Sequence, residues 1–306
     1  KHSQQVPLVA EIFFVVFAAA GLPQGVFQVL HMTHEDTLKL VATEGIDFVA
    51  FTGSVEGGRI VQRAAADRFI GLGLELGGKD PAYVRADADL TNAVENLVDG
   101  AFFNSGQSCC GVERIYVHAS LYDDFVAQFV ELTKAYRFGN PMETDTNLGP
   151  MVRASSADFV RKQIDEAVQA GAKALIPNGQ FAHDEFGTAY LSPQVLVDVN
   201  HSMRVMTEAS FGPVIGIMPV KDDNEALALM TDRDFGLSAS IWTKETAAAM
   251  ALAEQLETGT VFMNRCDYLD PALAWTGVKI TGRGVSLTIL GYAQLTRLKS
   301  ILFRTG

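Results

Sequence analysis

Residues 46–79 read IDFVAFTGSVEGGRIVQRAAADRFIGLGLELGGK, and this stretch decides the fold class. The β-rich run Ile46–Phe51 predicts a short strand, the residues through Ala66 predict a helix, and the apolar run Phe69–Leu76 predicts a second strand. A helix between two strands returns the chain to the same end of the sheet, so the two strands run parallel. The stretch therefore predicts an α/β protein.

The same alternation of helix and strand continues on both sides of this stretch. Before it, helical patterns cover Pro7–Ala20 and Glu35–Glu44. After it, helices are predicted at Asp89–Asn104, Ser120–Tyr136, Ser156–Ala170, Asn224–Met230 and Thr246–Leu256, and strands at Arg114–His118, Ala172–Ile176, Val195–Val199, Pro213–Val220, Leu237–Thr243 and Thr258–Asn264. The polar stretch Pro177–Thr188 predicts a surface loop, and Gln294–Arg304 predicts an extended terminal segment.

Length and charge limit the classes of function. The chain has 306 residues, 48% of them hydrophobic, which suits two globular units or one large one. Acidic residues number 36 against 24 basic ones, giving a formal charge of -12. A surface this negative repels phosphate backbones and anionic lipids, so we expect neither nucleic-acid nor membrane binding. The apolar stretch Leu8–Leu22 contains Glu11 and is shorter than the ~20 residues of a membrane span.

Cysteine and histidine usage indicates a reducing compartment and no metal. Three cysteines, two of them adjacent, cannot build a disulfide framework, which favours the cytoplasm. The six histidines show no metal-ligand spacing.

The first candidate site is the turn at 51–58, where Gly53 and Ser54 lie between a predicted strand and a predicted helix. Glycines at such a turn let backbone N–H groups approach an anion, which the helix N-terminus also favours. The alternative is a tight turn in which Ser54 caps the helix.

The second candidate is Cys109, which follows Gly106-Gln107-Ser108 and precedes Cys110. A cysteine in a glycine-bearing loop beside a helix can act as a nucleophile, because local dipoles lower its pKa. The alternative is a buried structural thiol.

The third candidate is Glu75, within Leu74-Glu75-Leu76-Gly77-Gly78-Lys79. A carboxylate at the end of an apolar strand is costly unless it has a role, and general-base catalysis is one such role. The alternative is an ion pair with Lys79 or another cation.

Together these motifs resemble the aldehyde dehydrogenase superfamily in residue type, order and spacing. They are Phe-Thr-Gly-Ser-x-x-x-Gly at 51–58, Leu-Glu-Leu-Gly-Gly-Lys at 74–79 and Gly-Gln-x-Cys at 106–109. Three later landmarks of the family follow: Phe211-Gly212-Pro213, Phe262-Met263-Asn264, and Gly277-Val278-Lys279 before Gly282-Arg283-Gly284. The resemblance runs from Lys1 to the C-terminus.

The resemblance implies oxidation of an aldehyde to a carboxylate with NAD or NADP. Cys109 would attack the aldehyde to give a thiohemiacetal, and loss of a hydride would leave a thioester. Glu75 would activate the water that hydrolyses this thioester. The backbone N–H of Cys109 would be one donor to the oxyanion.

The resemblance also assigns cofactor contacts. Gly53 and Ser54 would lie by the pyrophosphate, Lys1 by the adenosine ribose and Phe211 by the nicotinamide ribose. Ala209 stands where the family usually has a glutamate at the nicotinamide ribose.

Position 4 bears on the choice of dinucleotide. Gln4 replaces a family glutamate at the adenosine ribose, and a neutral residue there leaves both NAD and NADP open.

Four aromatic residues are candidates for the substrate pocket, with ordinary core packing as the alternative for each. They are Phe102, Phe103, Tyr268 and Trp275.

The resemblance implies a domain plan that begins part-way into the family's cofactor domain. Residues 1–78 would form the last part of a Rossmann-type domain, residues 79–290 the catalytic domain, and residues 291–306 an oligomerisation segment. We therefore expect a homodimer or homotetramer, and apolar surface exposed in the incomplete cofactor domain. Two alternatives remain open: a pseudoenzyme or structural protein with this fold, and a thiol esterase that needs no cofactor.

Overall fold

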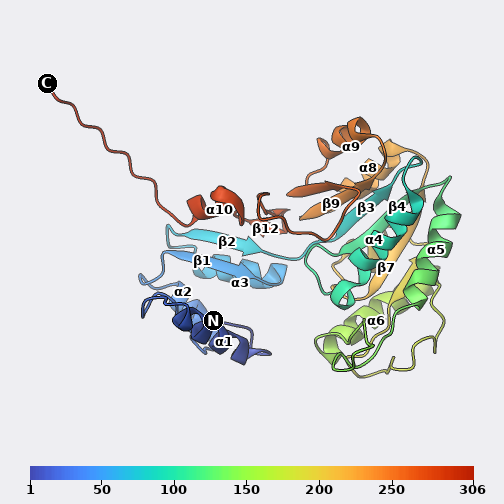
Figure 1. The fold of residues 1–306 in the computed structure, drawn as a ribbon, viewed down its shortest axis with the longest axis horizontal. Coiled ribbons are helices and arrows are strands. Elements are labelled where there is room, and N and C mark those ends of the chain that lie inside the picture. Colours follow the sequence, from blue (N-terminus) through green and yellow to red (C-terminus); the bar gives the residue numbers. More distant parts are fainter.

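The computed structural model describes residues 1–306 and has two lobes, each built around its own sheet (Figure 1). The larger lobe holds a seven-stranded sheet in the order β10-β9-β3-β4-β7-β6-β5. Its strands are β3 (Asp80–Val84), β4 (Val112–His118), β5 (Lys173–Ala174), β6 (Gln194–Val197), β7 (Val214–Val220), β9 (Ser238–Trp242) and β10 (Thr260–Met263). All neighbouring strands are parallel except β5, which pairs antiparallel with β6.

Helices cover both faces of this sheet. On one face lie α4 (Leu90–Phe102) and α5 (Tyr122–Lys134); on the other lie α6 (Ala154–Gln169), α7 (Arg204–Thr207), α8 (Asp223–Thr231) and α9 (Thr246–Ala253). Successive residues of a strand point to opposite faces, so Ala82 and Val84 pack against α4 and α5 whereas Tyr83 packs on the other side. The resulting two cores hold the lobe together.

The smaller lobe contains the stretch that decided the fold class. β1 (Phe48–Thr52) and β2 (Gly71–Glu75) are parallel, with α3 (Val55–Ala64) between them in the chain. This confirms the predicted α/β fold. A third strand, β12 (Gly282–Arg283), joins β2 antiparallel. Gly282 is required there: its φ is +132°, and an added Cβ would lie 1.9 Å from the backbone oxygen of Leu74.

The remaining elements are short or lie at the ends of the chain. They are α1 (Pro7–Ala19), α2 (His34–Val41), the 3₁₀ turn η1 (Phe103–Gly106), the antiparallel pair β8 (Phe235–Gly236) and β11 (Val278–Lys279), and α10 (Thr288–Gln294). The predicted surface loop Pro177–Thr188 contains no helix or strand, as expected. Beyond Gln294 the chain has no helix or strand. Arg297 still pairs with Asp47 beside β1 at 3.0 Å, and the last residues extend away from both lobes (Figure 1).

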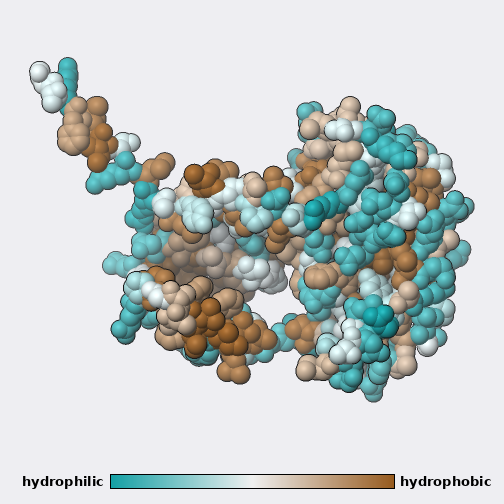
Figure 2. All heavy atoms as spheres, in the orientation of Figure 1, coloured by the Kyte–Doolittle hydropathy of each residue, from teal (hydrophilic) through white to brown (hydrophobic).

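Helix α1 exposes an apolar surface. Only Ala10 is buried, whereas Leu8 is 72% and Val15 63% exposed. Figure 2 shows this surface as a hydrophobic patch on the smaller lobe. The sequence predicts exposed apolar surface in this part of the chain, and α1 shows such a surface. No helix in the structure combines the length and the apolar character needed to cross a bilayer.

Candidate active site

The three candidate motifs meet where the two lobes join. Glu75 ends β2, Gly78 and Lys79 lead into β3, and Cys109 lies just before β4. A Cβ added to Gly78 would lie 2.9 Å from the backbone oxygen of Cys109, so these two segments are in contact.

A second close approach adds the Phe211 loop to the site. Gly106 has a φ of +69°, and a Cβ there would lie 2.2 Å from the backbone oxygen of Gly212. Only glycine fits this position, which holds the loop carrying Cys109 against the loop carrying Phe211.

Cys109 has the environment of a reactive thiol. Its side chain is half-buried. The neighbouring Cys110 thiol lowers the pKa of Cys109 below its ordinary value, although burial and the charges of Asp267 and Glu75 oppose this shift. A lower pKa increases the thiolate fraction near neutral pH, and the thiolate is the nucleophile.

Cys110 has the opposite character. It is buried, and its Sγ donates to Asp267 Oδ1 at 2.9 Å. Ser108 Oγ donates to the same oxygen at 2.7 Å. The neighbouring Cys109 thiol, burial and the Asp267 carboxylate all raise the pKa of Cys110. The two adjacent thiols therefore differ: the pKa of Cys109 is lowered and the pKa of Cys110 is raised.

Glu75 lies close enough to Cys109 for its charge to act on the thiol. Its Oε1 accepts a hydrogen bond from Ser286 Oγ, which fixes the carboxylate. The alternative of an ion pair between Glu75 and Lys79 is wrong. Lys79 Nζ points instead to Glu113, at 2.6 Å.

The Lys79–Glu113 pair is buried and organises the Phe211 loop. Glu113 accepts the backbone N–H of Ser210 at 2.8 Å and of Phe211 at 2.9 Å, and Lys79 Nζ donates to Ser210 Oγ at 3.1 Å. Burial lowers the pKa of Lys79, against the attraction of Glu113, which raises it. Phe211 has a φ of 47° and a side chain that is partly exposed, so Glu113 stabilises a strained backbone.

Replacing Glu113 by glutamine leaves the buried Lys79 ammonium without its counter-charge. We expect the free energy of unfolding in urea to fall by about 3–5 kcal/mol. The control is Glu131→Gln in the exposed pair with Lys134, which should cost less than about 1 kcal/mol. Equal losses in the two variants would contradict the structural role of Glu113.

Of the cofactor residues predicted from the sequence, Gly53 and Ser54 lie near Glu75, whereas Lys1 does not contact them. The Gly53 N–H donates to the backbone oxygen of Glu75 at 3.1 Å, so the turn with Gly53 and Ser54 adjoins the end of β2. Ser54 is also the N-cap of α3, accepting the Gly57 N–H at 3.1 Å. Lys1 is exposed, and no hydrogen bond or ion pair links it to these residues.

The four aromatic candidates for the substrate pocket lie in different environments. Tyr268 and Trp275 belong to the small apolar cluster that Cys109 borders. Phe102 is fully buried in the core under α4 and α5, whereas Phe103 is 59% exposed. Core packing is therefore the role of Phe102.

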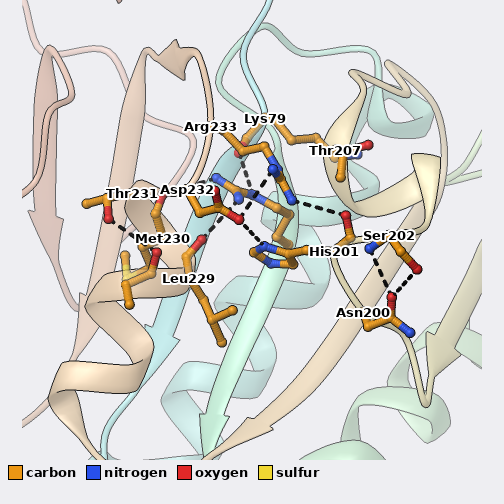
Figure 3. A network of polar contacts seen from close by, with 12 residues as sticks. Lys79, Asn200, His201, Ser202, Thr207, Leu229, Met230, Thr231, Asp232 and Arg233 are labelled. Carbon is orange, nitrogen blue, oxygen red and sulfur yellow. Dashed lines mark hydrogen bonds and ion pairs between the residues drawn. The ribbon is translucent and has the colours of Figure 1, made fainter.

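A polar network behind the site was not predicted. Figure 3 shows it around His201 and Asp232. His201 Nδ1 lies 3.0 Å from Asp232 Oδ2, and its Nε2 lies 2.8 Å from the Tyr116 hydroxyl. Arg114 donates to Tyr116 at 3.3 Å and to the backbone oxygen of Lys79 at 2.9 Å. The network thus connects the segment before α7 to the start of β3.

This network predicts a pH dependence of stability. Burial lowers the pKa of His201 below 6.5; Asp232 opposes this, and Arg233 and Arg114 add to it. The folded state therefore binds this proton less readily than the unfolded chain. The stabilisation is complete above pH 6.5 and is lost as the pH falls through the lower, folded-state pKa.

We expect the free energy of unfolding to decrease as the pH falls below about 6.5, and less steeply in His201→Gln. The control is His34→Gln at the exposed start of α2. An unchanged slope in His201→Gln would show that another group titrates.

Comparison with known proteins shows which family the chain matches. A family model described as "Aldehyde dehydrogenase family" matches residues 1–301. A protein of Emericella nidulans named aldehyde dehydrogenase is 35% identical over 308 residues, covering 100% of this chain and 61% of that protein. A succinate-semialdehyde dehydrogenase [NADP(+)] of Mycobacterium avium is 35% identical over 98% of this chain and 63% of its own length.

Solved structures agree in fold. The structure of Gox0499 superposes with a TM-score of 0.93 at 33% identity, covering 100% of this chain and 66% of that one. An NADP-dependent glyceraldehyde-3-phosphate dehydrogenase from Bacillus halodurans, in complex with NADP, gives a TM-score of 0.83 at 39% identity, covering 90% and 56%. The chain therefore spans less than two thirds of these relatives.

Proposed function

Because the chain belongs to the aldehyde dehydrogenase family, we propose that it oxidises an aldehyde to a carboxylate with NAD or NADP, through a thioester on Cys109. The observation that carries this proposal is the meeting of an activated thiol and a fixed carboxylate, Cys109 and Glu75, between the two lobes. The relatives named for NADP, and a betaine aldehyde dehydrogenase solved with NAD+, support either dinucleotide.

The first step belongs to Cys109. Its thiolate attacks the aldehyde carbon, and a carbon–sulfur bond forms while the carbonyl oxygen becomes an oxyanion. The backbone N–H of Cys109 is a donor for this oxyanion, in a loop that Gly106 holds rigidly against the Phe211 segment. The product is a thiohemiacetal.

The residues at the start of α3 fit the anionic part of a dinucleotide. Helix α3 begins after Ser54, so the N–H groups of Val55 and Glu56 point out of its first turn. Ser54 Oγ takes the Gly57 N–H and leaves these two for a phosphate oxygen. The bound dinucleotide supplies the hydride acceptor.

Two further residues are proposed to contact the cofactor: Phe211 at the nicotinamide ribose, and Lys1 at the adenosine ribose by the resemblance alone. The Lys79–Glu113 pair holds the backbone of Phe211 beside the Cys109 loop, which orients the partly exposed ring. Ala209 provides no charged acceptor, so positioning at this end depends on the Phe211 segment.

Glu75 performs the last step. Its carboxylate takes a proton from a water molecule, and the resulting hydroxide attacks the thioester carbon and releases the carboxylate product. Ser286 holds the Glu75 carboxylate in place for this proton transfer. The Cys109 thiolate is regenerated as the leaving group.

The test is spectrophotometric. The protein is mixed with NAD or NADP and a panel of aliphatic, aromatic and carboxylate-bearing aldehydes, and formation of the reduced dinucleotide is followed. Reduction with at least one pair supports the proposal. If folded protein gives no reduction with any pair, dehydrogenase activity is wrong for this chain. Ester hydrolysis without dinucleotide would then favour the thiol esterase, and failure to bind any dinucleotide the pseudoenzyme.

We also propose a homodimer or homotetramer in the cytoplasm. Support for assembly comes from the projecting C-terminal segment, in which Leu298, Leu302 and Phe303 are 98%, 92% and 86% exposed. Three free cysteines support a reducing compartment. Sedimentation of the protein and of a variant ending at Gln294 tests the assembly: a monomer in both cases would contradict it.

A further inference from the structure

The turn that leads into the Cys109 loop has an unusual backbone. Starting two residues after α4, three successive residues adopt left-handed conformations, with φ values of 51° at Asn104, 58° at Ser105 and 69° at Gly106. Glycine accepts such a φ freely and asparagine tolerates it, but serine adopts it rarely. A strained backbone persists only where its surroundings hold it in place. Ser105 therefore needs support from outside the turn.

We propose that Ser105 and Gln107 are positioning residues: they hold this left-handed turn and thereby hold Cys109 where its thiolate can attack the aldehyde. The proposal rests on the proposed function in one respect, that Cys109 is the nucleophile. The two residues act through the backbone of the loop rather than on the substrate.

Ser105 is tied to a segment from a distant part of the chain. Its side chain is buried, and its Oγ donates to the backbone oxygen of Gly149 at 2.5 Å. Gly149 lies in an anchored segment, because Leu148 packs in the core on one face of the seven-stranded sheet and Met151 in the core on the other. The Met151 N–H also donates to the backbone oxygen of Ala189 at 2.8 Å. One side-chain hydrogen bond thus joins the turn to a fixed part of the larger lobe.

Gln107 supports the turn from its other end. Its Nε2 donates to the backbone oxygen of Asn104 at 3.0 Å, and Asn104 Nδ2 donates back to the backbone oxygen of Gln107 at 3.1 Å. The Gln107 backbone N–H reaches the same Asn104 oxygen at 3.2 Å. Its Oε1 accepts the N–H of Val152 at 2.7 Å. Gln107 therefore closes the turn on itself and joins it to the segment that also holds Ser105.

A change in the turn would move Cys109. If Ser105 relaxed to a right-handed conformation, Gly106 would leave its close approach to the backbone oxygen of Gly212. The residues that follow Gly106 would then be displaced, among them the Cys109 thiol and the backbone N–H proposed as the oxyanion donor. Small displacements at a reacting group reduce the rate, because attack depends on its position.

Two substitutions of Ser105 separate support of a strained backbone from ordinary packing. Both remove the hydrogen bond to Gly149. Ser105→Ala keeps a Cβ and with it the strain, whereas Ser105→Gly removes the strain together with the hydrogen bond. Packing alone predicts the reverse order, since glycine leaves the larger void at a buried position. We therefore expect glycine to preserve the turn better than alanine.

Amide hydrogen exchange of the whole protein measures the turn directly. Peptides covering residues 103–110 should exchange at least about fivefold faster in Ser105→Ala than in Ser105→Gly, because the Gln107 N–H loses its protection. Gln107→Leu keeps a side chain of similar size without its hydrogen bonds, and should exchange as fast as Ser105→Ala. The control is Ser155, an exposed residue of helix α6, at which glycine should exchange faster than alanine.

The burst of reduced dinucleotide measures the position of Cys109. At saturating aldehyde and dinucleotide, the burst rate should fall at least about tenfold in Ser105→Ala and in Gln107→Leu, and Ser105→Gly should recover most of it. Both Ser155 variants should keep the rate of the unsubstituted protein. If the unsubstituted protein reduces no dinucleotide, alkylation of Cys109 by iodoacetamide replaces the burst. Its rate should differ at least about threefold between Ser105→Ala and the unsubstituted protein, and Ser105→Gly should restore it.

Two results would overturn the proposal. The first is an exchange rate in Ser105→Gly equal to or higher than that in Ser105→Ala, which would show that Ser105 only fills space. The second is faster exchange in Ser105→Ala with no change in the rate at Cys109, which would show that the turn does not position the nucleophile. A dehydrogenase assay that is silent in the unsubstituted protein contradicts the proposed function alone, because exchange and alkylation are measured without aldehyde or dinucleotide.

Discussion

Replacing Cys109 by alanine is expected to reduce the rate of aldehyde-dependent dinucleotide reduction by at least about 10⁴-fold. Without the thiolate no carbon–sulfur bond forms, and water cannot replace it before the hydride leaves. The rate is measured at saturating aldehyde and dinucleotide. The protein should remain folded, because Cys109 is only half-buried and borders its apolar cluster from outside.

The matched control for this variant is Cys266→Ala. Cys266 lies against Gly100 of α4 and contacts the backbone oxygen of Asn96 at 3.4 Å rather than the loop that carries Cys109. Its removal should leave the rate within about threefold, since the thiol makes no bond to substrate. Comparable rates for Cys109→Ala and the unsubstituted protein would exclude Cys109 as the nucleophile.

Replacing Glu75 by glutamine is expected to separate the two halves of the reaction. Steady-state turnover should fall by about 10²–10⁴-fold, because water loses its general base. The first burst of reduced dinucleotide, equal to one turnover, should remain. The charge of Glu75 raises the pKa of Cys109, so a neutral glutamine at position 75 does not reduce the fraction of Cys109 that is thiolate. Stopped-flow absorbance measures both phases.

The control for Glu75→Gln is Ser286→Ala. Ser286 only holds the carboxylate, so its removal should slow turnover less than removal of the carboxylate itself. If Glu75→Gln loses the burst together with the turnover, Glu75 acts before the thioester forms, and its assignment to hydrolysis is wrong.

Local features of the fold could be predicted from sequence because they depend on neighbours in the chain. The expected strand Ile46–Phe51 matches β1 (Phe48–Thr52), and the expected helix through Ala66 matches α3. Hydrophobic periodicity and the capping residue Ser54 act within a few residues.

The contacts behind the site could not be predicted because they join distant segments. Lys79 pairs with Glu113, although Glu75 is nearer in the chain, because strand pairing between β3 and β4 brings Glu113 beside it. Asp267 and His201 likewise reach their partners from loops far away in the sequence. Neither residue lies in one of the recognised sequence motifs, so the spacing of residues in the sequence does not predict its role.

The proposed reaction passes through a thioester on Cys109. To test this, an aldehyde and a dinucleotide are added to the Glu75→Gln variant, and the reaction is stopped with acid during the burst. The masses of the tryptic peptides are then measured by mass spectrometry. We expect the peptide Ala86–Arg114 to gain the mass of the acyl group, at Cys109, in proportion to the reduced dinucleotide. Reduction of the dinucleotide with no acyl group on this peptide, or with the acyl group on another residue, would contradict it.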